Sequence, residues 1–187
     1  MPHIALPEHL PGISSGFAFR PETATPMRAL AHILLYEPNS LTSGERELIA
    51  TYVSSENDCH FCQFSHGAAA AAHLGDQAVV IQVKSDFENA PVSAKLKALL
   101  RIAGEVQRGG KNVTATSVSV ARAQGATDME IHDTVLIAAA FCMYNRYVDG
   151  LATWQPTDES MYTEMGKHLA AVGYTTPSMG KDSQPGR

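Results

Sequence analysis

The chain has 187 residues, of which 44% are hydrophobic and 18% are charged, and its formal net charge is −5. These values predict a single globular domain, because disordered chains contain fewer apolar residues and carry more charge. The sequence has no basic stretch, which argues against nucleic acid or an anionic membrane as a partner. It also has no apolar run of membrane-spanning length, and its three cysteines are too few for a disulfide scaffold.

The first residues predict an irregular arm over 1–24, because Pro2, Pro7, Pro11 and Pro21 interrupt regular structure there. The same segment lacks the basic and apolar regions of a secretory signal. A pair of cysteines in a chain without such a signal is more often catalytic or metal-binding than structural. We therefore expect a cytoplasmic protein.

Helix signals then recur along the chain, and no segment shows convincing strand alternation. Thr25 can cap the first helix with Pro26 at its first position, and Thr42 with Glu45 forms a capping box for the next. Caps, glycines and prolines delimit five more helices, at about 76–84, 91–109, 116–124, 127–150 and 157–173. The sequence thus predicts an all-α bundle of about eight helices over 25–173, followed by a mobile tail over 174–187.

One short run carries two thiols and a base: Cys59-His60-Phe61-Cys62-Gln63-Phe64-Ser65-His66. Asn57 or Asp58 can cap a helix that contains this run and ends at Gly75. His66 lies one turn beyond Cys62, and residues three or four apart are neighbours on a helix. Thiols at the start of a helix also feel its positive end, which favours the thiolate. Two thiols with a base beside them are the groups required for reversible dithiol–disulfide chemistry.

A zinc site and an inert buried pair of thiols are the competing interpretations of the same run. Structural zinc usually takes four ligands, commonly from a second Cys or His pair. The remaining candidates form no such pair: His60, His66, His73, His132 and Cys142. Dithiol chemistry is therefore favoured, and Cys142 is interpreted as a small buried apolar residue.

Glu47, twelve positions before Cys59, completes a pattern with Cys62 and His66. This spacing resembles that of the carboxymuconolactone decarboxylase-like superfamily, in particular its alkylhydroperoxidase D-like, peroxidase-related branch. The resemblance extends from about Thr25 to Leu151. It implies a helical bundle of that type and an enzyme that reduces hydroperoxides with the help of an external dithiol. It implies no metal, haem or flavin.

The resemblance also implies a role for each of four residues. Cys62 attacks the peroxide, Cys59 resolves the intermediate as a disulfide, and His66 and Glu47 handle protons. The residues alone leave the attacker open, because the helix end favours Cys59 whereas the nearby His66 favours Cys62. One position departs from the family pattern: alkylhydroperoxidase D has a histidine where this chain has Phe61, which places efficient peroxidase activity in question.

Two other functions remain open. One is a small-molecule enzyme of the carboxymuconolactone decarboxylase type, although the resemblance implies that such members lack the pair Cys59 and Cys62. The other is a non-catalytic interaction protein whose disulfide switches a surface. Turnover of peroxide with a dithiol would separate the enzyme from the switch.

Self-association is the last expectation. The helices near Lys95–Val106 and Glu130–Val148 have broad apolar faces, and the N-terminal arm is rich in apolar residues. The resembling family is commonly built from dimers, trimers or hexamers. We expect a homo-oligomer based on dimers, such as a hexamer, with a hydroperoxide and a dithiol reductant as the other partners and with neither nucleic acid nor membrane.

Overall fold

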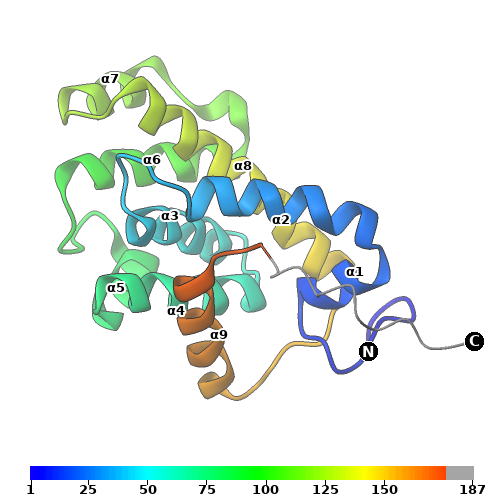
Figure 1. The fold of residues 1–187 in the computed structure, drawn as a ribbon. Helices are drawn as coiled ribbons and strands as arrows, with labels where there is room; N and C mark the ends of the chain where they lie inside the picture. The colour runs from blue at the N-terminus through cyan, green and yellow to red at the C-terminus, as the bar shows by residue number, and fades with distance from the viewer. Residues whose placement is uncertain (176–187) are drawn as a thin grey trace, which may run out of the picture.

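The computed structural model describes residues 1–175, and all regular structure in this range is helical (Figure 1). The all-α prediction is therefore confirmed. Residues 1–175 form nine α-helices and one 3₁₀ turn: α1 (Ile13–Phe19), α2 (Pro21–Leu35), α3 (Ser43–Glu56), α4 (His60–Leu74), α5 (Gln77–Asp86), α6 (Ala94–Arg108), η1 (Gly110–Asn112), α7 (Ala115–Ala123), α8 (Asp128–Gly150) and α9 (Glu159–Val172).

Helices α3 and α4 form the centre of the bundle. α3 packs against α4, α6 and α8, and α9 packs along α4 on the other side, as Figure 1 shows with α9 in orange. Burial of one large aliphatic side chain contributes about 1.5–3 kcal/mol. Several such side chains from α3, α6 and α8 are fully enclosed between these helices, among them Leu48, Ile49, Leu99, Leu100, Ile102 and Ile137.

Both predicted capping boxes are present and set the starts of α3 and α8. The Thr42 hydroxyl accepts a hydrogen bond from the backbone N–H of Glu45, whose carboxylate accepts one from the N–H of Thr42 at 2.8 Å. Thr127 and Glu130 make the same reciprocal pair at the start of α8. Each cap satisfies backbone donors that the first helical turn would leave unpaired.

The turn between α3 and α4 places the thiols. Asp58 has a φ of 54°, its N–H donates to the carbonyl of Ser55, and the N–H of Cys59 donates to the carbonyl of Ser54. This pair of bonds is a Schellman motif that ends α3. The prediction that Asn57 or Asp58 caps α4 is therefore wrong, because both residues complete α3. Cys59 is itself the N-cap residue of α4.

The prediction of an irregular arm over 1–24 is wrong from Ile13 onward, where α1 forms and α2 begins at Pro21. Either Pro21 or Pro26 could occupy a first helical position. The structure uses the earlier one, since Pro at this position loses no helical hydrogen bond, and it accommodates Pro26 inside α2.

The arm packs on its own chain. The N–H of Gly12 donates to the carbonyl of Trp154 at 2.8 Å, and Phe17 is buried. The broad apolar face of α6 is also buried in the core of the same chain. Two of the three features from which self-association was predicted are therefore explained within one chain.

At the other end of the chain, Tyr174 and Thr175 follow α9 and border a cavity. The predicted mobile tail over 174–187 is thus wrong at its first two residues, and the rest of it lies outside the described residues. Among residues 1–175, no helix has the length and apolar character required to cross a bilayer.

Candidate functional site

Glu47 and His66 form a buried pair across the α3–α4 interface. Nδ1 of His66 lies 2.8 Å from Oε2 of Glu47, and the two side chains are 14% and 2% exposed. Helices α3 and α4 are consecutive and packed together, so a residue in the first turns of α3 meets one in the second turn of α4. The spacing seen in the sequence therefore corresponds to a direct contact.

The two thiols are free and lie in different surroundings. Cys62 lines a cavity of about 640 Å³, whereas Cys59 is fully enclosed behind it, with 0% exposure. The Cys59 thiol donates a hydrogen bond to the sulfur of Cys62, and this bond raises the pKa of Cys59, which burial raises further. Cys59 therefore holds its proton.

The same contacts act on Cys62 with the opposite sign. The hydrogen bond from Cys59 lowers the pKa of Cys62; burial opposes this effect, and the positive charge of His66 and a hydrogen bond from Asn145 reinforce it. The net pKa of Cys62 is below that of an ordinary thiol. The structure thus favours a thiolate at the sulfur that faces the cavity.

His66 carries charge more readily than an ordinary histidine. Burial lowers its pKa, but the charge and hydrogen bond of Glu47 and the charge of Cys62 outweigh burial, so the pKa of His66 is raised. The rings of His66 and Phe141 also pack in a T-shaped arrangement, with centroids 4.6 Å apart. His66 is therefore held between a carboxylate, an aromatic ring and the reactive thiol.

Three residues that sequence reasoning did not select complete the site. Asn145 of α8 hydrogen-bonds to Cys62, Asp149 one turn further along α8 lies beside Cys59, and the hydroxyl of Tyr174 contacts both Glu47 and His66. Asn145 is 1% exposed, and a buried amide needs partners, which it finds in Asn57 and Ser54 as well. A polar residue within the apolar face of α8 was a signal that could have identified Asn145.

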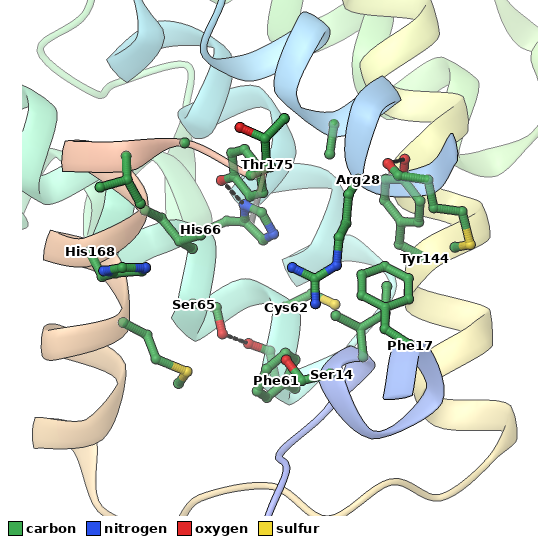
Figure 2. Close-up of a pocket in the computed structure, with 18 of the residues that line it drawn as sticks. Ser14, Phe17, Arg28, Phe61, Cys62, Ser65, His66, Tyr144, His168 and Thr175 are labelled. Atoms are coloured by element: carbon green, nitrogen blue, oxygen red, sulfur yellow. Dashed lines mark hydrogen bonds between the residues drawn. The ribbon is translucent and has the colours of Figure 1, made fainter. Parts of the chain in front are cut away.

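The cavity beside Cys62 lies between α1, α2, α4, α8 and α9. In Figure 2, Cys62 and His66 are directed into it from α4, and Arg28 reaches in from α2. Burial lowers the pKa of Arg28, whose guanidinium lies over the ring of Phe17. Most of the other lining side chains are apolar, for example Met27, Phe61, Phe141, Met165 and Leu169.

Phe61 stands where the family pattern has a histidine, and it lines the cavity. Its ring also packs against Gly12, so closely that a methyl group on Gly12 would lie 2.3 Å from the ring. His60 is exposed and packs against Phe64 with the rings tilted by 44° and their centroids 4.5 Å apart. Phe61 thus anchors the start of α1, and His60 lies outside the cavity. Among residues 1–175, no group of three or more His, Cys, Asp or Glu side chains is arranged to hold a metal ion.

Comparisons with known proteins agree with this geometry. The model of the carboxymuconolactone decarboxylase family matches residues 21–83, which include Glu47 and both thiols of the run. No curated protein matches the chain in sequence.

Three solved structures share the fold. An alkylhydroperoxidase AhpD core, an uncharacterised peroxidase-related protein from Ralstonia eutropha, superposes with a TM-score of 0.75 at 26% identity over 84% of this chain and 82% of its own. An uncharacterised peroxidase-related protein from a Silicibacter species superposes with a TM-score of 0.74 at 27% identity, over 82% of this chain and 78% of its own. A protein of unknown function from Agrobacterium tumefaciens superposes with a TM-score of 0.67 at 21% identity, over 76% of this chain and 97% of its own. The chain is thus similar to the carboxymuconolactone decarboxylase family over residues 21–83 and, over most of its length, to two structures described as peroxidase-related proteins.

Proposed function

We propose that the protein is a thiol-dependent peroxidase that reduces hydroperoxides with the pair Cys62 and Cys59. The observation that carries this proposal is the contrast between the two thiols. Cys62 has a lowered pKa and lines the cavity, whereas Cys59 is enclosed and donates its proton to the Cys62 sulfur. An attacking thiolate and a resolving thiol need this arrangement.

In the first step the Cys62 thiolate attacks the terminal oxygen of the hydroperoxide. The S–O bond forms as the O–O bond breaks, and the departing alkoxide takes a proton to leave as an alcohol. His66 is suited to supply that proton, because its pKa is raised and it contacts the Cys62 charge. Cys62 is then a sulfenic acid.

In the second step the Cys59 sulfur attacks the Cys62 sulfur. The S–S bond forms, the S–O bond breaks, and hydroxide leaves with a proton as water. The carboxylate of Asp149 lies beside Cys59 and is suited to accept the thiol proton as the S–S bond forms. An external dithiol then reduces the disulfide by thiol–disulfide exchange.

The cavity supports an organic hydroperoxide as the substrate. It encloses about 640 Å³ and is lined largely by apolar side chains, which suits an alkyl or aryl group better than hydrogen peroxide. The proposed site needs no metal, haem or flavin, and we place this enzyme in the cytoplasm.

The test is turnover with organic hydroperoxides and a dithiol, together with intact mass after mild oxidation. A Cys142→Ser background leaves only the two site thiols. Oxidation should remove two hydrogens and protect both thiols from alkylation, and Cys62→Ser should abolish turnover. Absence of turnover with every hydroperoxide and dithiol, or thiols that remain alkylatable after oxidation, would refute the proposal.

A further inference from the structure

We propose that Tyr174 is a positioning residue of the thiol site. Its hydroxyl holds the Glu47 carboxylate in the orientation from which Glu47 supports His66 and, through His66, the reactive state of Cys62. The consequence for turnover rests on the proposed peroxidase function, whereas the effect on thiol reactivity can be measured without it.

The buried carboxylate of Glu47 accepts a hydrogen bond on each of its two oxygens. Glu47 is 1% exposed, and a buried carboxylate is stable only where its oxygens accept hydrogen bonds. His66 Nδ1 bonds to Oε2, and the Tyr174 hydroxyl bonds to Oε1. With one donor on each oxygen, the plane of the carboxylate is fixed. Loss of the hydroxyl would leave Oε1 without its donor and would permit the carboxylate to rotate away from His66.

The hydrogen bonds also locate the protons of Tyr174 and His66. Burial and the charge of Glu47 raise the pKa of Tyr174 well above its ordinary value, so the phenol keeps its single proton and donates it to Glu47. The proton between His66 and Glu47 must then be that of Nδ1. In residues 1–175 every hydrogen bond of the His66 ring involves Nδ1, which leaves Nε2 to exchange a proton on the cavity side. Tyr174 therefore helps to set the tautomer of His66.

Independent contacts fix the place of Tyr174. Gly173 ends α9 with a φ of 69°, and a Cβ there would lie 2.6 Å from Nδ1 of His32 and 2.8 Å from the ring of Tyr36. The N–H of Tyr174 donates to Nδ1 of His32 at 3.2 Å. The rings of Tyr174 and His66 stack at 13°, with centroids 5.7 Å apart. The chain thus turns back over the site at Gly173, where glycine is the residue type that fits.

Several other ionisable groups face Cys62, and their contributions must stay constant in any test. The facing groups are Cys59 and His66 of α4, Asp149 of α8 and Tyr162 of α9. Arg28 of α2 and Glu164 and His168 of α9 line the same cavity. Replacement of Tyr174 by Phe keeps the stacked ring and all these groups and removes only the hydroxyl.

The experiment measures the rate of Cys62 alkylation against pH in the reduced Cys142→Ser protein, with mass mapping of the modified residue. In Tyr174→Phe, Glu47 supports the charge of His66 less well, so the pH midpoint should rise and the rate at neutral pH should fall about fivefold to tenfold. This is less than the usual effect of losing a direct hydrogen bond to a charged group, because the hydroxyl acts on Cys62 only through Glu47 and His66. Tyr36→Phe is the matched control. Its hydroxyl bonds to the carbonyl of Ala171 and holds the same end of α9 without touching Glu47, so its profile should equal that of the parent protein.

Two further variants distinguish positioning from general stabilisation. Gly173→Ala keeps the hydroxyl but displaces it, and it should reproduce the shift of Tyr174→Phe. In a Glu47→Gln background, Tyr174→Phe should cause no further shift, because the two residues act through one contact. A parental profile for Tyr174→Phe, or a full additional shift in the Glu47→Gln background, would overturn the proposal. A shift of the expected size in a protein that reduces no hydroperoxide would refute the peroxidase function and support the role of Tyr174.

Discussion

Cys59 and Cys62 lie three residues apart at the start of one helix, yet their surroundings are opposite. Cys59 is the N-cap residue, faces the carboxylate of Asp149 and has a raised pKa, whereas Cys62 faces the cavity and His66 and has a lowered pKa. A helix end contributes typically 0.3–1 kcal/mol, whereas burial beside a charge can shift a pKa by several units. The hydrogen bond between the two thiols, together with His66 and Asn145, thus favours a thiolate at Cys62 and outweighs the helix end that favours Cys59.

The largest expected change to this contrast comes from His66→Ala. Without the positive charge, the pKa of Cys62 should return toward or above the ordinary value of about 8.5, so thiolate at neutral pH should fall roughly 10- to 100-fold. Reactivity depends on the thiolate, so in the parent protein it should be lost only as the pH falls through the lowered pKa of Cys62. In the variant it should already be lost at a higher pH.

Alkylation rate against pH, with thermal unfolding alongside, measures this effect. His60→Ala is the control, because His60 is exposed and packs against Phe64 outside the cavity. The rate should fall far more than the stability in His66→Ala and should stay unchanged in the control. Equal pH profiles for parent and His66→Ala would assign His66 a structural role only.

A smaller effect is expected from Asp149→Asn, which keeps the shape of the side chain and removes its charge. The negative charge of Asp149 raises the pKa of both thiols. Its loss should therefore lower both pKa values and make Cys59 more reactive once the protein is partly opened. Because Asp149 is exposed to solvent, the alkylation rate of Cys62 should rise only about threefold at a pH below its midpoint. A decrease in that rate would contradict the assignment of the charge effect.

The smallest expected effect on the thiols comes from self-association, since both thiol environments are built within one chain. We propose a dimer-based homo-oligomer, supported by Phe19 and Ile33 of α1 and α2, which are 57% and 60% exposed. Ile33→Asp should reduce the mass found by light scattering and leave the alkylation profile unchanged. A parent protein that is monomeric at all concentrations would exclude the assembly.

Local signals predicted much of the fold. The capping boxes at Thr42 and Thr127 fixed the starts of α3 and α8, because each involves residues only three positions apart. The start of α2 was misplaced because Pro21 and Pro26 satisfy the same local rule. The choice between them depends on packing, which the sequence does not display.

The site was predictable only in part for the same reason. Glu47 and His66 stand out through a spacing that resembles a family pattern, and the structure brings them within 2.8 Å. Asn145, Asp149 and Tyr174 are separated from the thiols by more than eighty residues, and no local rule connects such positions. Burial and the contacts of Asn145 and Asp149 also act on the pKa values of the two thiols, which explains in part why the residues alone left the attacker open.

The distance of these contacts along the chain has a consequence for synthesis. A nascent chain that has emerged as far as α4 already carries both thiols and His66, but it still lacks Asn145, Asp149 and Tyr174. The full set of contacts forms only after α8 and the turn at Gly173 have packed against α4. The environment that supports a thiolate at Cys62 is therefore complete only when the last helices have packed.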